Sequence, residues 1–192
     1  MRSRDSVSQG LESITPTPVN SKVGSRNILV AGIPGSGKTT YCQWLEQEKG
    51  FLHLDIDELL QDRGTEQKLA LIDCLRHTAE KFLRAISKVE QPIAIDWGFP
   101  PWLLSLAELF KGSEFSIWWF DGDRDAAKAA FIQRGSPDRS LQVFDVQIKS
   151  IEEDWPRMQK VIEDNIICSV SVGPTHAAPE DIYGRMFSRR SR

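Results

Sequence analysis

The chain of 192 residues has few of the residue types that mark a metal or redox centre. It contains three cysteines, Cys42, Cys74 and Cys168. Their number is odd and they lack the paired spacing of metal ligands, so we expect buried free thiols rather than a disulfide or metal role. The three histidines are isolated in the same way, and the sequence assigns them no chemistry. They are His53, His77 and His176.

Long apolar runs and a strong excess of one charge are also missing. No stretch approaches the roughly 20 apolar residues of a membrane span, and the N-terminus lacks the apolar core of a secretory signal. We therefore expect a cytoplasmic protein. The net charge of −3 gives no reason to expect nucleic acid or a membrane as a partner.

The length is that of one domain, with a low-complexity stretch before it. Residues 1–26 are rich in Ser, Thr, Pro, Gln and Asn, a composition that cannot bury enough apolar surface to offset its ordering entropy. We expect a flexible arm there, a folded domain over 27–173, and a tail over 174–192. The tail is predicted to hold one short helix near 182–187.

What the chain does have is one glycine-rich loop, residues 32–39, that reads GIPGSGKT. It fits the pattern G-x-x-x-x-G-K-[ST] without a mismatch. The apolar run 28–31 before it predicts a buried strand, and a helix is predicted over 40–48, with Gly50 placed to end it. Glycines let such a loop turn its N–H groups inward, and the first turn of a helix adds more unpaired donors. The loop is therefore predicted to bind a nucleoside triphosphate.

The residues of this loop are expected to have separate roles. Lys38 should reach the β- and γ-phosphates, and the Thr39 hydroxyl should ligate Mg²⁺. The other expected nucleotide contacts are Gly32, Pro34, Gly35, Ser36, Gly37 and Thr40.

The rest of the chain alternates between strand and helix patterns. Further strands are predicted over 51–54, 92–96, 115–120 and 166–170. Helices are predicted over 66–90, 101–110, 123–134 and 141–165, and Pro156 must kink or restart the last one. The apolar stripe of the long helix 66–90 is expected to be plain core. It consists of Leu69, Ile72, Leu75, Ala79, Phe82, Ile86 and Val89. Alternating strands and helices predict a three-layer α/β fold, with a parallel sheet covered on both faces and ligands at the carboxyl ends of the strands.

Three acidic residues follow predicted strands and are candidates for the site. Asp96 ends the third strand, where it would hold Mg²⁺ or order a water on it, although it could instead cap the next helix. Asp55 and Asp57 are spaced by two at the end of the second strand, so both side chains could point the same way. We predict Asp57 as the carboxylate that orients an acceptor hydroxyl and takes its proton, with Asp55 as the second choice.

Phosphoryl transfer also needs positive charge over the moving phosphoryl group. Arg134 at a predicted helix end and Arg139 in the following polar loop are spaced to reach over the site from a mobile lid. Arg124 and Arg63 are weaker candidates.

With these motifs the chain resembles the P-loop kinase group, in particular small AAA-type ATP-binding proteins related to zeta toxins, polynucleotide 5′-kinases and chloramphenicol phosphotransferase. The resemblance spans 27–170 and rests on the segments 32–39, 55–59 and 96–99. It also includes Trp119-Phe120-Asp121 with Arg134, and Phe144 with Gln147.

The resemblance implies a five-stranded parallel sheet in the order 2-3-1-4-5, ATP with Mg²⁺ as donor, and an acceptor that bears a hydroxyl. It makes Asp57 the acceptor-orienting acid and Arg134 the lid arginine. Such proteins often have an arginine directly after the position of Leu59, where this chain has Leu60. They often have another in the helix after the third strand, where this chain has Trp102-Leu103-Leu104.

Two relatives of this fold are disfavoured by missing motifs. Shikimate kinase also has an acid-x-acid pair, but it needs a triple glycine that the segment 97–100 does not supply. The Asn-Lys-x-Asp motif of a GTPase is missing as well.

The predicted function is an ATP-dependent kinase acting on a hydroxyl of a small molecule or nucleotide-like acceptor. An ATP-binding regulatory module that hydrolyses slowly or not at all is the alternative from another class, and a toxin-like kinase of a nucleotide sugar is a third possibility. The acceptor and the oligomeric state stay open.

Overall fold

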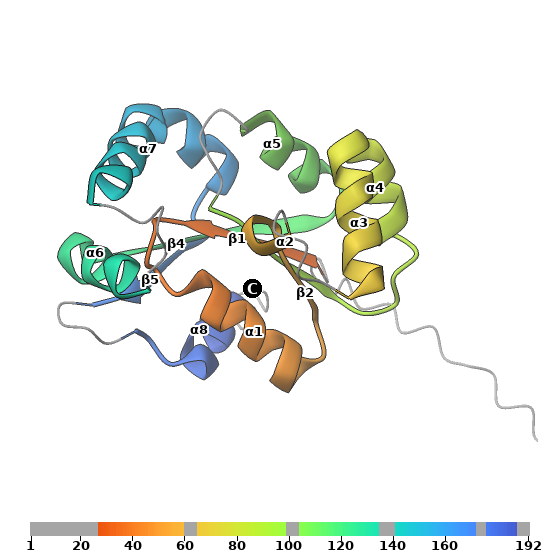
Figure 1. The fold of residues 1–192 in the computed structure, drawn as a ribbon, viewed down its shortest axis with the longest axis horizontal. Helices are drawn as coiled ribbons and strands as arrows, with labels where there is room; N and C mark the ends of the chain where they lie inside the picture. Colours follow the sequence, from red (N-terminus) through yellow and green to blue (C-terminus); the bar gives the residue numbers. More distant parts are fainter. Residues whose placement is uncertain (1–26, 60–64, 99–103, 135–140, 172–175, 188–192) are drawn as a thin grey trace, which may run out of the picture.

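The fold is a parallel sheet between two layers of helices, seen edge-on in Figure 1. A computed structural model describes residues 27–59, 65–98, 104–134, 141–171 and 176–187. The sheet has five strands in the order β2-β3-β1-β4-β5, as predicted, and every pairing is parallel. The strands are β1 Asn27–Gly32, β2 Leu52–Asp55, β3 Ile93–Asp96, β4 Phe115–Gly122 and β5 Ile166–Val170.

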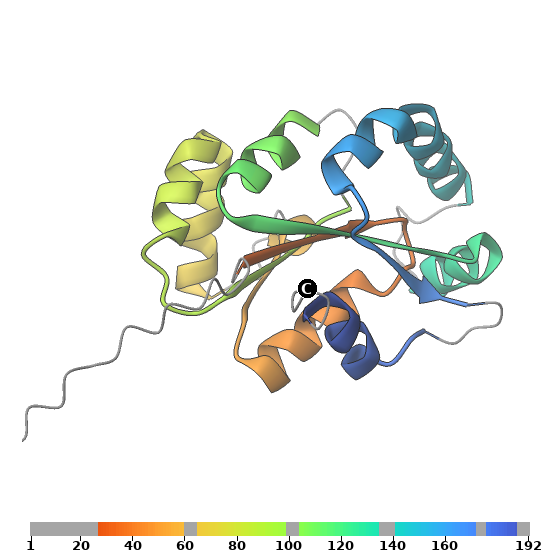
Figure 2. The same ribbon diagram turned by 180° about the vertical axis from the view of Figure 1, so that it is seen from behind.

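Each face of the sheet is covered by its own helices (Figures 1 and 2). Helices α3, α4, α5 and α7 lie over one face, α1 and α8 lie over the other, and α6 follows the end of β4. The bounds are α1 Lys38–Lys49, α2 Ile56–Leu59, α3 Glu66–His77, α4 Ala79–Ile86, α5 Leu104–Gly112, α6 Arg124–Gln133, α7 Leu141–Ile162 and α8 Pro179–Phe187. None of the described helices is long and apolar enough to cross a membrane.

The two helical layers explain why the strands are continuous apolar runs. Successive side chains of a strand point to opposite faces, and both faces are buried here. Leu29 and Ala31 belong to the core under α5 and α7, whereas Ile28 and Val30 belong to the core under α1 and α8. The tryptophan pair of β4 divides in the same way, and both side chains are core residues as expected, with Trp118 3 % and Trp119 0 % exposed.

The predicted long helix over 66–90 is wrong. The chain forms two helices, α3 and α4, separated at Thr78, whose φ of −157° and ψ of 138° are those of an extended residue. The Thr78 side chain caps α4 by accepting a hydrogen bond from the backbone N–H of Lys81 at 3.0 Å. The buried face of α3 also differs from the predicted one. Leu69, which was expected in the core, is 37 % exposed, whereas Leu71, outside the expected stripe, is 5 % exposed.

Other local predictions had mixed outcomes. Helix α1 ends at Gly50 in the left-handed conformation, as expected. Helix α7 contains Pro156 without restarting there. Of the cysteines, Cys42 is buried, but Cys74 is only partly buried and Cys168 is exposed. The expectation of three buried thiols is therefore wrong, and Cys168 is exposed because it lies on β5, an edge strand of the sheet.

Several predicted features lie outside the described residues. They are the arm 1–26, the predicted start of α5 at Pro101 and the whole polar loop 135–140, which holds Arg139. Helix α5 is described from Leu104, and the helix of the tail begins at Pro179, earlier than predicted.

Candidate functional site

The glycine-rich loop connects β1 to α1 at the carboxyl edge of the sheet. Two of its glycines have a left-handed backbone, with φ of 74° at Gly35 and 82° at Gly37. A Cβ at Gly35 would lie 2.0 Å from the backbone oxygen of Ala127, and one at Gly37 would lie 2.7 Å from the ring of His176. Both positions therefore require glycine for two reasons, backbone conformation and space. The loop packs its backbone against neighbours and leaves no side chain at the N-cap of α1, which suits an anion.

Distant parts of the chain hold the loop in place. The N–H of Ile33 donates to the carbonyl of Phe120 on β4 at 3.1 Å. The Ser169 hydroxyl on β5 lies 2.8 Å from the carbonyl oxygen of Ser36. Nε2 of His176 donates to the carbonyl of Gly35 at 3.1 Å, because a carbonyl can only accept. Ser169 and His176 were not predicted as site residues, since neither belongs to a motif and both lie more than a hundred residues from the loop.

Lys38 is the first residue of α1 and folds back over the loop. Its ammonium donates to the carbonyls of Gly32 at 3.2 Å and Ile33 at 3.0 Å. Burial lowers the pKa of Lys38, the Asp96 carboxylate opposes this, and the Arg134 charge lowers the pKa further. The loop thus holds the Lys38 ammonium at its own carbonyls, in a position where the charge of Arg134 affects the pKa of the lysine.

Asp96 lies at the end of β3, beside Val30 of β1 in the parallel register. It is 3 % exposed, and burial raises its pKa to about 6, against the opposing effects of the Lys38 charge and of a hydrogen bond from the Thr39 side chain. Its Oδ2 atom has no hydrogen-bond partner. The Asp96 carboxylate together with the Thr39 hydroxyl that hydrogen-bonds it is an all-oxygen donor set, which fits a hard divalent cation. Thr39 and Asp96, which the sequence assigned to Mg²⁺, are therefore brought together.

Asp55 and Asp57 are separated by a change of secondary structure. Asp55 is the last residue of β2, paired in register with Asp96, and it is partly buried. The chain becomes helical at Ile56, so the continuing strand on which their common direction was predicted is not present. Asp57 lies in α2 and is exposed, and its Oδ2 is 3.3 Å from where a Cβ of Gly98 would stand. Asp55 therefore belongs with the buried acid and Asp57 with the open side of the site.

The remaining predicted residues are less uniform. Arg134 is the C-cap of α6 and exposed. Arg124 forms an ion pair with Asp121 and so has a structural partner. Arg139 and Arg63 lie outside the described residues.

The other loop positions fall into two groups. Ser36 is buried, and its hydroxyl donates to the carbonyl of Ile33 at 2.8 Å, so its side chain stabilises the loop itself. Pro34 is partly buried, while Thr40 is exposed on the first turn of α1.

His53 is a further residue at this edge of the sheet for which the sequence predicts no role. It is 5 % exposed on β2, and its Nε2, which has no hydrogen-bond partner, lies 4.0 Å from Oδ2 of Asp96. Burial lowers the pKa of His53, and the Asp55 charge opposes that effect. A polar residue inside the buried run 51–54, two positions before Asp55, was the signal that could have marked it.

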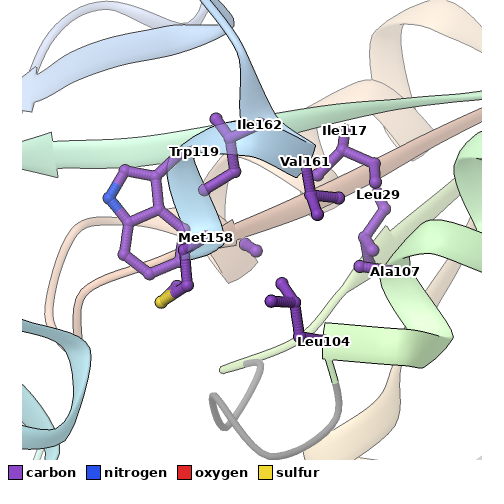
Figure 3. Close-up of a pocket in the computed structure, with 9 residues that line it drawn as sticks. Leu29, Leu104, Ala107, Ile117, Trp119, Met158, Val161 and Ile162 are labelled. Atoms are coloured by element: carbon purple, nitrogen blue, oxygen red, sulfur yellow. The ribbon is translucent and has the colours of Figure 1, made fainter. Parts of the chain in front are cut away.

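The cavity in Figure 3 is separate from this site. It lies between the sheet and helices α5 and α7 and is lined by core side chains such as Leu29, Leu104 and Trp119. Its volume of about 10 Å³ is at the lower limit for one water molecule. It is therefore a packing defect and not a substrate pocket.

Comparison with known proteins supports the fold. Neither a protein-family model nor a curated protein sequence matches the chain. Among solved structures, shikimate kinase from Acinetobacter baumannii in complex with shikimate is similar with a TM-score of 0.60 and 14% identity, over 86% of this chain and 95% of that one. An uncharacterized protein from Eubacterium ventriosum reaches a TM-score of 0.51 at 14% identity, over 86% of this chain and 99% of that one. A gluconokinase from Sinorhizobium meliloti reaches a TM-score of only 0.48 at 15% identity, over 86% and 91%.

At these identities the likeness concerns the fold. The chain has the P-loop fold seen in shikimate kinase, with the same layers and a sheet of order 2-3-1-4-5. The comparisons do not single out the AAA-type proteins of the sequence-based resemblance.

Proposed function

We propose that this protein is a P-loop kinase that transfers the γ-phosphate of ATP to a hydroxyl group of a small molecule or nucleotide-like acceptor. The observation that carries the proposal is the glycine-rich loop, with two left-handed glycines, a lysine held at its carbonyls and the Thr39–Asp96 pair beside it. The similarity in fold to shikimate kinase supports it. A relation to zeta toxins, polynucleotide 5′-kinases and chloramphenicol phosphotransferase is part of the proposal, as is a cytoplasmic location.

The residues of the loop fit a magnesium nucleotide. A Cβ at Gly35 would meet the backbone of Ala127, and a Cβ at Gly37 would meet the His176 ring, so neither position has room for a side chain. The loop therefore offers main-chain groups at these positions, and its N–H groups would bind phosphate oxygens. A bound Mg²⁺ would supply positive charge that offsets the charge of the phosphates. Thr39 and Asp96 would hold it, and Lys38 would exchange its two carbonyl partners for phosphate oxygens.

Asp57 is the proposed positioning and basic group for the acceptor. Its carboxylate is exposed, beside Gly98, whereas Asp55 and Asp96 are withdrawn into the sheet edge. A carboxylate in this position can accept a hydrogen bond from the acceptor hydroxyl and then its proton. Arg134, whose charge is felt at Lys38, is proposed to stabilise negative charge on the transferred group. Arg139 is kept as a second candidate for the same role on sequence grounds alone.

The proposal is tested by a transfer screen with γ-labelled ATP over nucleosides, nucleotide sugars, simple sugars and aminoglycoside-like alcohols. We expect one acceptor class to be phosphorylated, with kcat reduced roughly 100-fold or more in Asp57→Asn because a general base contributes about 10²–10⁴. ATP affinity should stay unchanged in this variant. Asp164→Asn, which alters an exposed acid in the turn between α7 and β5, is the control and should behave as the wild type.

One observation favours an ATP-binding module without an acceptor. Leu104 occupies a stretch where the resembling kinases often carry an arginine, and it is 7 % exposed in the core, so it offers the site no charge. ATP binding with no transfer to any acceptor, together with slow hydrolysis that is the same in Asp57→Asn, would support this module and contradict the kinase.

A further inference from the structure

Two buried polar atoms face each other across a gap at the carboxyl edge of the sheet. Nε2 of His53 and Oδ2 of Asp96 are 4.0 Å apart, and neither has a hydrogen-bond partner. The side chains are only 6% and 4% exposed. The distance is too long for a direct hydrogen bond, and burying two such atoms unpaired is unfavourable. An ion or a water molecule between the two atoms would satisfy both of them.

A third ligand atom belongs to the same cluster. One carboxylate oxygen of Asp55, one ring nitrogen of His53 and one carboxylate oxygen of Asp96 all lie within 4.8 Å of one another. The sheet explains this meeting. His53 and Asp55 are two residues apart on β2 and so share one face of the strand, and Asp55 is in register with Asp96 on the neighbouring strand β3.

We propose that His53, Asp55 and Asp96 form a binding site for a divalent transition-metal ion with the chemistry of Zn²⁺, Co²⁺ or Mn²⁺. An imidazole nitrogen combined with carboxylates selects such ions over Mg²⁺, which prefers oxygen ligands alone. Two carboxylates balance the charge of the ion. Three protein ligands leave a position open for water or for an anionic ligand, as in catalytic zinc sites.

The separations are compatible with metal binding after a small movement. Metal–ligand distances of about 2.0–2.2 Å place tetrahedral ligand atoms roughly 3.4 Å apart. His53 and Asp96, 4.0 Å apart, would therefore approach each other by about 0.6 Å. Because all three ligand atoms lie within 4.8 Å of one another, no pair would have to approach by more than about 1.4 Å, a movement that side-chain rotation can supply. A single bridging water is the other occupant that fits this gap, and the two are separated by experiment.

This site shares Asp96 with the proposed kinase function, but it requires no nucleotide. Metal binding is therefore measured on the nucleotide-free protein, where failure of ATP binding or of phosphate transfer has no influence on the result.

The test is titration of metal-stripped protein with Co²⁺, followed by its visible absorption. We expect one equivalent to give d–d bands, Zn²⁺ to displace them, and a large excess of Mg²⁺ to leave them unchanged. His53→Gln should weaken Co²⁺ binding roughly 100-fold or more, since losing even an outer-shell partner of a metal costs about 10–100-fold. His77→Gln is the matched control, because His77 is an exposed histidine with Nδ1 3.6 Å from the Asp73 carboxylate, and it should bind Co²⁺ like the wild type.

The proposal is overturned if the wild type binds Co²⁺ no more tightly than Mg²⁺, or if His53→Gln and His77→Gln bind Co²⁺ equally well; a water then bridges the two atoms. Circular dichroism checks the fold of each variant. Should His53→Gln fail to fold, Asp55→Asn replaces it and should show the same selective loss of Co²⁺ binding. Zn²⁺ should also raise the melting temperature of the wild type, because it binds only the native arrangement of the three ligands.

Discussion

At the scale of single residues, the loop glycine Gly35 and the helix glycine Gly184 differ in whether their surroundings allow a side chain. Gly35 has a φ of 74° and a Cβ there would lie 2.0 Å from a backbone oxygen. Gly184 lies inside α8 with no atom within 4 Å of a Cβ. We expect Gly35→Ala to lower the free energy of unfolding by about 2 kcal/mol or more, since it adds both left-handed strain and overlap. Gly184→Ala should raise it by roughly 0.5–1 kcal/mol.

Urea unfolding of the two alanine variants measures this contrast. Equal effects at the two positions would contradict the backbone conformation assigned to the loop.

Asp96 makes stability depend on pH in a direction unusual for an acid. Burial raises its pKa from 3.8 to about 6, so the folded protein binds the proton more tightly than the unfolded chain does. The stabilising effect of protonation is full below pH 3.8 and is lost as the pH rises to about 6. In protein free of metal and nucleotide, we expect Asp96→Asn to be more stable than the wild type by about 3 kcal/mol at pH 7.5 and by about half of that at pH 5.

Unfolding of both proteins in urea at the two pH values gives the difference directly. A difference that is independent of pH would mean that the Asp96 carboxyl is not held in a low-dielectric position.

At the scale of elements, the separation of α3 from α4 depends on Thr78. Its side chain accepts from the Lys81 N–H, which satisfies one of the unpaired donors at the start of α4. We expect Thr78→Ala to lower the free energy of unfolding by about 1 kcal/mol. Ser105→Ala, an exposed change inside α5, is the control and should stay within about 0.5 kcal/mol of the wild type.

Thermal unfolding of the two variants tests whether the Thr78 cap stabilises the start of α4. If Thr78→Ala were as stable as the wild type, the side-chain cap would contribute nothing measurable, and the break between α3 and α4 would depend on other contacts.

At the scale of the whole molecule, a nucleotide that binds only the folded chain must stabilise all of it. Mg·ATP at 100 times its Kd should add about 2.7 kcal/mol, or roughly 5–10 °C in melting temperature for a chain of this size. Lys38→Met should remove most of this shift, since Lys38 is held at the loop by two hydrogen bonds. Lys160→Met, an exposed change in α7, should keep it.

Differential scanning fluorimetry with and without Mg·ATP measures both variants. A shift that is the same in Lys38→Met and the wild type would contradict nucleotide binding at this loop.

The layered fold could be predicted from the sequence because the patterns that indicate its strands and helices are local. Apolar runs of four to six residues, such as the segment before Gly32, predict strands buried on both faces. The helix stop at Gly50 is local as well. So is the start of the helix predicted over 123–134, where the Asp123 side chain accepts from the Ala126 N–H at 2.8 Å. The interruption at Thr78 was not readable, because two consecutive helices that cover one core keep nearly the same apolar spacing as one.

The glycine-rich loop could likewise be recognised from eight consecutive residues, since its chemistry depends on backbone conformations that glycine and its neighbours impose on themselves. The supports of the loop and the pairing of His53 with Asp96 could not be recognised in this way. Ser169 meets Ser36, and His53 meets Asp96, because parallel strands far apart in the chain are brought into register by their crossover helices. That register depends on the simultaneous packing of helices on both faces of the sheet, so it cannot be predicted from any short segment alone.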